Sequence, residues 1–336
     1  MDIKSAIKKL SEAQNLSTSE MQNAMDIIMS GKASPTQIAA FLMGLRVKGE
    51  SVEEISAAVS ILRKKMLPVL APNNAIDIVG TGGDGMGTLN ISTASAIVVA
   101  ASGTPVAKHG NKALSSKSGS SEALQALGVK LDLSSDEISN CIKQANIGFM
   151  FAPNHHPAMK YVGPVRSELG IRTIFNLLGP QSNPAGVKQY LLGVYAKEWV
   201  KPVASALLAN GATSAWVVYG SDGLDEITTT GKTFVCAIEN SKLRSFEINP
   251  EDAGLTIAKA SELTGGEPKY NAAKLRALLE SEKSAYRDIV LFNAAASFII
   301  AGKVKDLKAG VKMGEELIDS GKALKTLEKL IEVSNN

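Results

Sequence analysis

AIDIVGTGGDGMGTLNISTASAIVVAASGTPVAK, residues 75–108, contains the patterns of a strand, a glycine-rich loop, a helix and a second strand in succession. AIDIV (75–79) and PVAK (105–108) are short apolar runs typical of buried strands, whereas STASAIVVAAS (92–102) has the length of a helix. A strand that alternates with a helix predicts a parallel sheet covered by helices. The fold class is therefore α/β, with a mainly parallel central sheet.

The same alternation continues along the chain. Further predicted helices cover 120–127, 135–146 and 197–209, and further predicted strands cover 149–152, 190–195 and 215–220. Residues 157–182 break this rhythm, and we expect helical pieces there that pack back on the N-terminal part of the chain. The loops at the carboxyl ends of parallel strands are where open α/β folds bind ligands.

The first 70 residues predict a separate small helical domain. Capping boxes pair Ser17 with Glu20, Ser34 with Gln37, and Ser51 with Glu54, so three helices begin there. LPVLAPNN (67–74) carries two prolines and reads as a linker. We therefore expect a helical domain over 1–70, to which 157–182 adds segments, and a large α/β domain over 73–156 and 183–336.

Composition limits the class of protein. The chain has 336 residues, 45% of them hydrophobic and 21% charged, which is typical of a soluble globular protein. Its 36 basic and 33 acidic residues give a net charge of +3, which offers no general nucleic-acid surface. Two cysteines make neither a disulfide framework nor a zinc site. The N-terminus has no apolar stretch of a signal peptide and no run long enough to span a membrane, so we expect a cytoplasmic protein without a membrane partner.

The loop after the first strand holds five glycines within Gly80–Gly87, with Asp84 among them. Gly80, Gly82 and Gly85 satisfy GxGxxG, but Leu89 and Asn90 separate the loop from the helix, and no acid follows where a dinucleotide's ribose would bind. A P-loop also fails because no GK[ST] follows. A flexible turn without a ligand is the remaining general interpretation.

Three polar clusters favour a ligand with several phosphates. NIST (90–93) opens the next helix, where Ser92 or Thr93 could cap it and its N–H groups could bind phosphate. KHGNKALSSKSGSSE (108–122) follows a predicted strand, and GLDEI (223–227) places Asp225 beside Glu226. The alternative for the serines of 108–122 is a solvated loop, and the alternative for Asp225 and Glu226 is a charged surface without a ligand. Mg²⁺ needs only one or two carboxylates or hydroxyls when it also binds phosphate oxygens and water, so Asp225, Glu226 and Ser92 would suffice.

Four longer segments together resemble the anthranilate phosphoribosyltransferase family: GTGGDGMGTLNIST, KHGNKALSSKSGSSEALQALG, NHHPAMKYVGPVRSELGIRTIFNLLGPQSNP and DGLDEI. They occur in the family's order across residues 79–227, and the helical N-terminus and total length also agree. The resemblance implies a small helical domain hinged to a large α/β domain, a homodimer formed through the small domains, and a Mg²⁺ requirement. It implies transfer of the phosphoribosyl group of 5-phosphoribosyl 1-pyrophosphate (PRPP) to anthranilate, and an association with anthranilate synthase components is a further expected partner.

The resemblance also assigns site residues. Those matching the PRPP site are Gly80, Thr81, Gly82, Gly83, Asp84, Thr88, Asn90, Ser92, Thr93, Lys108 and Ser120. Those matching the anthranilate site are Gly80, His109, Asn111 and Arg166, and those matching the metal site are Ser92, Asp225 and Glu226. No single residue is assigned as a catalytic acid or base, because an aromatic amine is already nucleophilic at neutral pH and pyrophosphate bound to Mg²⁺ is a good leaving group.

One residue departs from the family pattern, and two other classes of protein remain as alternatives. The family usually reads KHGNR, and Lys112 replaces that arginine, which keeps the charge but loses the bidentate geometry of a phosphate contact. His155 is expected to be structural, since zinc would need further ligands.

A pyrimidine nucleoside phosphorylase would share the fold but carry a loop like KHSTGG in place of KHGNKA. A nucleic-acid-binding relative without catalytic activity would be strongly basic.

Overall fold

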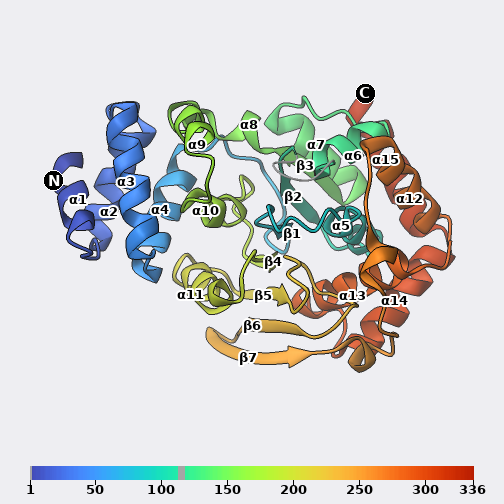
Figure 1. The fold of residues 1–336 in the computed structure, drawn as a ribbon. Coiled ribbons are helices and arrows are strands. Elements are labelled where there is room, and N and C mark those ends of the chain that lie inside the picture. The colour runs from blue at the N-terminus through green and yellow to red at the C-terminus, as the bar shows by residue number, and fades with distance from the viewer. Residues whose placement is uncertain (1, 113–117) are drawn as a thin grey trace.

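The computed structural model describes residues 2–112 and 118–336, and it has a bundle of helices beside a helix-covered sheet (Figure 1). The chain begins in the bundle, at the left of Figure 1, and its C-terminal helices lie on the far side of the sheet. Residues 113–117, part of the predicted serine-rich phosphate segment, lie outside the described residues.

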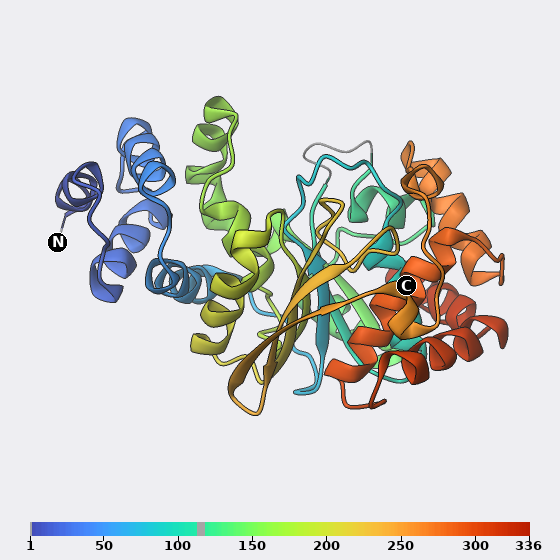
Figure 2. The ribbon, with the colours of Figure 1, turned by 60° about the horizontal axis from the view of Figure 1, so that its bottom comes forward.

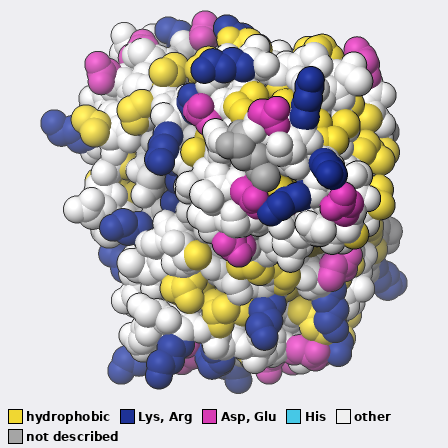
Figure 3. All heavy atoms as spheres, turned by 90° about the vertical axis from the view of Figure 1, so that its left-hand side faces the viewer, with side chains coloured by type: hydrophobic (Ala, Val, Ile, Leu, Met, Phe, Trp, Pro, Cys, Tyr) yellow, Lys and Arg dark blue, Asp and Glu magenta, His cyan; other side chains and the backbone are white. Residues whose placement is uncertain are grey.

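Four helices form the N-terminal bundle: α1 (Ile3–Ser11), α2 (Thr18–Met29), α3 (Pro35–Lys48) and α4 (Val52–Lys65). The three predicted capping boxes are present at the starts of α2, α3 and α4. Seen end-on, the surface of this part of the molecule carries hydrophobic areas between charged side chains (Figure 3).

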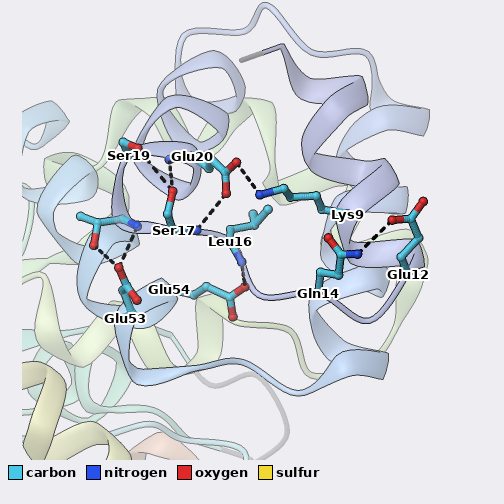
Figure 4. Close-up of polar contacts among 10 residues, drawn as sticks. Lys9, Glu12, Gln14, Leu16, Ser17, Ser19, Glu20, Glu53 and Glu54 are labelled. Carbon is cyan, nitrogen blue, oxygen red and sulfur yellow. Dashed lines mark hydrogen bonds and ion pairs between the residues drawn. The ribbon is translucent and has the colours of Figure 1, made fainter.

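Polar contacts stabilise the segments that connect the helices of the bundle (Figure 4). The carboxylate of Glu54 is fully buried, accepts hydrogen bonds from the N–H groups of Leu16 (2.9 Å) and Ser51 (2.8 Å), and pairs with Lys48 at 2.8 Å. One side chain therefore ties the α1–α2 connection to the start of α4.

The sheet has seven strands in the order β3-β2-β1-β4-β5-β6-β7. The strands are β1 (Ile76–Gly80), β2 (Val106–Gly110), β3 (Ile147–Phe151), β4 (Gln189–Gly193), β5 (Ser214–Gly220), β6 (Thr233–Glu239) and β7 (Lys242–Ile248). The first five run parallel, and β6 and β7 are antiparallel additions. The predicted class, a mainly parallel sheet with a helical N-terminal domain, is confirmed.

Helices cover both faces of the sheet (Figures 1 and 2). On one face α5 packs against β1 and α13 against β4, and on the other α11 packs against β5 and β6. The helices of this part are α5 (Ile91–Ala101), α6 (Ser120–Ala126), α7 (Ser135–Ala145), α11 (Val200–Ala209), α12 (Pro268–Leu279), α13 (Ala285–Ile300), α14 (Leu307–Asp319) and α15 (Lys322–Asn335), with short 3₁₀ turns at Lys197–Trp199, Pro250–Ala253 and Ala260–Leu263.

The segment that breaks the alternation lies against the bundle. Its pieces are α8 (Ala152–His155), a 3₁₀ turn η1 (Pro157–Tyr161), α9 (Gly163–Leu169) and α10 (Phe175–Gln181). The turn η1 packs on α2, α9 packs on α3, and α10 packs on α4. Arg63 on α4 donates to the carbonyls of Gln181 and Asn210, so the bundle is also hydrogen-bonded to the rest of the molecule.

Among the helices of residues 2–112 and 118–336, none combines the length and apolar character needed to cross a bilayer.

Candidate active site

Two adjoining cavities open at the carboxyl ends of β1 and β2. The first, about 200 Å³, is the glycine cavity, and the predicted residues that line it are Gly80, Thr81, Gly82, Gly83, Asp84, Thr88, Asn90, Ser92, Lys108, His109, Asn111, Ser120, Asp225 and Glu226. The second, about 530 Å³, is the histidine cavity, and the predicted residues that line it are Gly80, Thr81, His109, Asn111 and Arg166. The two cavities share Gly80, Thr81, His109 and Asn111, so molecules bound in them would meet there.

Gly80, Gly82, Gly83 and Gly87 of the glycine loop line the first cavity. Gly82, Gly83, Gly85 and Gly87 all have φ between 61° and 76°, a conformation that side chains other than glycine rarely adopt. The N–H of Gly82 already binds an anionic group, the carboxylate of Asp225, at 2.6 Å. The loop is therefore shaped to bind negatively charged oxygen.

Asp225 and Glu226 follow β5 and reach back to the glycine loop and to α5. Asp225 accepts from Gly82, and Glu226 accepts from the N–H of Ser92 at 3.2 Å. The pKa of Asp225 is raised to about 7 and that of Glu226 to about 8, first by burial and then by a neighbouring acid, Asp84 for Asp225 and Asp225 for Glu226. Two buried carboxylates this close need a cation or a proton to offset their charge.

The donor set suits Mg²⁺, which prefers hard oxygen ligands. In the described part of the chain, no three histidine, cysteine or acidic side chains gather as a complete metal site. A metal at Asp225 and Glu226 would therefore need further oxygens from a bound ligand or from water, which is how magnesium is usually held beside phosphates.

Lys108 places a cation behind the glycine cavity. Its Nζ donates to the carbonyl of Ile78 (2.6 Å) and to Oγ of Ser92 (3.2 Å), and only 2% of the residue is exposed. Burial lowers the pKa of this ammonium, while the carboxylates of Asp77, Glu226 and Asp225 raise it. Asp77 is itself fully buried and accepts from the N–H of His109 and from Asn183, which fixes the end of β2.

The start of α5 differs from the prediction. The helix begins at Ile91, one residue early, and no side chain caps it. The expectation that Ser92 or Thr93 acts as the cap is wrong, because both lie inside the first turn. Ser92 Oγ instead accepts from Lys108, whereas Thr93 is buried outside both cavities with its Oγ1 unpaired.

Asp84 is held in a turn at the rim of the glycine cavity. Its Oδ1 accepts from the N–H of Met86 at 3.1 Å. Its charge also contributes to the raised pKa of Asp225, so the two carboxylates lie close together. Lys112, the departure from the family pattern, also lines this cavity and lies 6.0 Å from the ring of Phe151.

Arg166 supplies the histidine cavity with a cation that lacks an acidic partner. Its guanidinium lies 5.4 Å from the ring of Phe175, and its Nε is buried without a hydrogen-bond partner. Burial lowers its pKa, and within the described residues no carboxylate pairs with it or lines the cavity. A half-buried guanidinium without an acidic partner is a binding group for a planar carboxylate.

Three residues outside the prediction also shape the site. Arg172 hydrogen-bonds the carbonyl of Gly83 and lies over the ring of Tyr195, and His156 lines the histidine cavity beside His109. Asn271, on α12, donates to Oδ1 of Asn90 at 3.0 Å. Arg172 and His156 lie inside a motif already singled out, whereas nothing in the sequence near Asn271 marks it. His155 lies apart, with Nδ1 against the carbonyl of Leu67.

The chain matches the glycosyl transferase family's helical bundle domain over residues 4–66 and its α/β domain over residues 72–324. Fold and site thus define a two-domain glycosyl transferase. The anthranilate phosphoribosyltransferases of Rhodopseudomonas palustris (strain HaA2) and Bradyrhizobium sp. (strain ORS 278) are 57% and 56% identical to it, over 99% and 100% of this chain and 99% of each relative. The chain belongs to the anthranilate phosphoribosyltransferase family.

Solved structures agree with this assignment. The anthranilate phosphoribosyltransferase of Thermus thermophilus superposes with a TM-score of 0.94 at 41% identity, covering 98% of this chain and 99% of that one. The Saccharomyces cerevisiae enzyme in complex with PRPP and Mg gives 0.92 at 32% identity, covering 99% and 98%. The same yeast enzyme in complex with 4-fluoroanthranilate gives 0.90 at 31% identity, with the same coverage.

Proposed function

We infer that this chain transfers the phosphoribosyl group of PRPP to the amine of anthranilate, giving N-(5-phosphoribosyl)anthranilate and pyrophosphate. One observation carries the inference: an anion-binding cavity built on glycine N–H groups meets a second cavity that holds an unpaired arginine. The reaction needs a polyphosphate and an aromatic carboxylate to be held side by side, and two cavities that share a wall provide that arrangement.

The glycine cavity is the proposed PRPP site. Gly80, Thr81, Gly82, Gly83 and Asp84 would contact the pyrophosphate, and the other contacts would come from Thr88, Asn90, Ser92, Thr93, Lys108 and Ser120. The burial of Thr93 outside the cavity makes its role the least supported of these.

We propose Mg²⁺ as the cofactor, held by Asp225 and Glu226 with help from Ser92. Bound Mg²⁺ would neutralise the charge that develops on the departing pyrophosphate. The support is the chemistry of two buried carboxylates with raised pKa values, together with the yeast relative that was crystallised with PRPP and Mg. Asp225 and Glu226 accept hydrogen bonds from the N–H groups of Gly82 and Ser92, and these N–H groups would be available to phosphate if the acids held the metal instead.

The histidine cavity is the proposed anthranilate site. Arg166 would bind the carboxylate through its planar guanidinium, while His109, Asn111 and Gly80 lie where the amine would meet the ribose carbon. The yeast relative in complex with 4-fluoroanthranilate supports a ligand of this class. Water competes as a nucleophile, so closure of the helical bundle toward the sheet would favour transfer over hydrolysis.

A fluorescence assay tests the reaction directly. The purified chain, mixed with PRPP, MgCl₂ and anthranilate, should consume anthranilate fluorescence only when all three are present. Omission of PRPP is the control, and release of uracil from uridine and phosphate, followed by absorbance, tests nucleoside phosphorylase activity separately. No consumption in the complete mixture would refute the proposed function.

A homodimer in the cytoplasm is the proposed state of the protein, with association with anthranilate synthase components as a further proposed contact. The bundle's surface carries hydrophobic areas among charges (Figure 3). Val47 on α3 is 81% exposed. Sedimentation of the wild type beside Val47→Glu tests the dimer. A monomer at micromolar concentration in the wild type would refute it.

A further inference from the structure

A row of hydrogen bonds leads from α12 to the glycine cavity. Asn271, on α12, accepts from the N–H of Gly266 through Oδ1 (2.7 Å) and donates from Nδ2 to Oδ1 of Asn90 (3.0 Å). Asn90 in turn donates from Nδ2 to the carbonyl of Ser118 at 3.3 Å. Asn90 and Ser118 line the glycine cavity, whereas Asn271 is 1% exposed and lines neither cavity. We refer to these four groups as the amide row.

Backbone groups at both ends fix the direction of the amide row. A backbone N–H can only donate and a carbonyl can only accept, so Gly266 requires the oxygen of Asn271, and Ser118 requires the NH₂ group of Asn90. The NH₂ group of Asn271 then points at Asn90, which accepts with its oxygen. Each of the two side-chain amides has one orientation that satisfies both of its neighbours. The orientation of the Asn90 amide therefore depends on Asn271.

The segment before α12 is joined to the glycine loop, which gives the amide row a fixed origin. Thr264 pairs with Thr88 in an antiparallel bridge, and the N–H of Gly265 donates to the carbonyl of Gly87 at 2.8 Å. A Cβ at Gly265 would lie 2.5 Å from the carbonyl oxygen of Thr88, so this close approach of two backbones requires glycine. The N–H of Gly266 therefore has a set position relative to the cavity.

We propose that Asn271 is a positioning residue for PRPP: it orients the amide of Asn90 so that the NH₂ group, and not the oxygen, is presented to a phosphate. The inference rests on the proposed function. The NH₂ group has two N–H donors, and among residues 2–112 and 118–336 only the carbonyl of Ser118 accepts from it. The second N–H is left for an anion. Phosphate oxygens only accept, so a reversed amide would present its lone pairs to the phosphate and repel it.

The backbone of Asn90 has separate support, so loss of Asn271 should change the side chain of Asn90 alone. The hydroxyl of Tyr286 donates to the carbonyl of Asn90 at 3.0 Å, and the N–H of Ala94 donates to the same carbonyl at 3.1 Å. Without Asn271, the two orientations of the Asn90 amide differ less in energy. Because a hydrogen bond to a charged group is stronger than one between neutral groups, its loss should weaken PRPP binding by about 10 to 100-fold.

The test is a double-mutant cycle of Asn271→Leu, which removes the hydrogen-bonding groups, with Asn90→Ala. Titration calorimetry with PRPP and MgCl₂, without anthranilate, measures the Kd of each protein. We expect Asn271→Leu to raise the Kd for PRPP by about 10 to 100-fold in the wild-type background and by less than about twofold in Asn90→Ala, because a residue that acts through another has no effect once that residue is absent. The KM for anthranilate should change less than about threefold.

Asn210→Leu is the matched control. The amide of Asn210 donates to Oγ of Ser56 at 3.0 Å and lines neither cavity. Its loss removes hydrogen bonds of the same kind from another part of the fold, so the Kd for PRPP should stay at the wild-type value.

Two outcomes would overturn the proposal: a wild-type Kd in Asn271→Leu, or an equal loss of affinity in both backgrounds, which would mean that Asn271 only stabilises the fold. If Asn271→Leu does not fold, Asn271→Asp takes its place, since its carboxylate still accepts from Gly266 but cannot donate to Asn90. The cycle subtracts the effect of the added charge, and an equal loss in both backgrounds again refutes the proposal. A wild type that does not bind PRPP refutes the proposed function, whereas a wild type that binds PRPP beside either contrary pattern refutes this inference alone.

Discussion

Replacement of Arg166 by methionine should separate the two substrates, because Arg166 lines only the histidine cavity. Its guanidinium has no acidic partner among residues 2–112 and 118–336, so a bound carboxylate would supply an ion pair that these residues do not. Two parallel hydrogen bonds between charged groups, at about 1.5–3 kcal/mol each, would contribute about 3–6 kcal/mol to binding. At about 1.4 kcal/mol for each factor of ten, Arg166→Met should raise the KM for anthranilate by roughly 10² to 10⁴-fold.

The same substitution should cost the free protein little. The buried Nε has no partner, so its removal leaves no hydrogen bond broken at that atom. The contact with Phe175 is lost, which costs about 0.5–2 kcal/mol, and the desolvation of a buried cation is relieved. The melting temperature should therefore change by only a few degrees.

Steady-state fluorescence with each substrate varied in turn measures the effect. The KM for PRPP should change less than threefold, and Arg166→Lys, which keeps the charge but loses the planar fork, should lie between the wild type and Arg166→Met. Aniline, which lacks the carboxylate, provides the control, since its slow turnover should be equal in all three proteins. Equal rises in both KM values, or an equal loss with aniline, would refute the assignment of Arg166.

Three further predictions follow from other parts of the site and fold. Asp225→Asn combined with Glu226→Gln should abolish turnover that depends on Mg²⁺ without lowering the melting temperature, and full activity at limiting Mg²⁺ would refute the metal assignment. Asp84→Gly should shift the Mg²⁺ and PRPP dependence by roughly 10 to 100-fold and leave anthranilate saturation unchanged; if only the melting temperature falls, Asp84 merely holds its turn with Met86. Glu54→Ala should lower the free energy of unfolding by about 3–5 kcal/mol, measured in urea, because it removes the acid that pairs with Lys48 and the acceptor of the Leu16 and Ser51 N–H groups. As the control, Glu332→Gln breaks an exposed ion pair of nearly equal length, with Lys329 at 2.9 Å, and should lower the free energy of unfolding by less than about 0.5 kcal/mol. Similar losses of stability in the two variants would contradict the burial argument.

The fold could be predicted because local signals and global topology agree. The capping boxes at Ser17, Ser34 and Ser51 act within four residues, so the sequence alone locates those helix starts. The parallel strands were found because each is a short apolar run next to a helix pattern. The sequence around Cys236 has the pattern of a strand, but the antiparallel pairing of β6 and β7 was not predicted, since β7 lies at the edge of the sheet and its exposed, charged side chains hide the apolar alternation.

The partners of the site residues could not be predicted, because they depend on packing across the chain. Asn90 was expected at a phosphate site, but its contacts with Asn271 and the hydroxyl of Tyr286 join segments about 180 and 196 residues apart. The cap expected at Ser92 failed for a related reason. Glu226 takes the Ser92 N–H and Lys108 takes the hydroxyl, so long-range contacts replace the local one.

The position of the acid pair depends on two glycines that face each other across the sheet. Gly80 ends β1, Gly193 ends β4, and the two are paired in the parallel register. A Cβ built at either position would overlap Asp225, at its carboxylate above Gly80 and at its backbone above Gly193. The loop after β5 can thus approach the glycine loop only because both strands end without a side chain. A shift of the register by one residue would place Leu192 opposite Gly80 and exclude Asp225 from the cavity. The register of β1 and β4 therefore determines where Asp225 and Glu226 lie, and alanine at Gly193 should displace both acids even though Gly193 lines neither cavity.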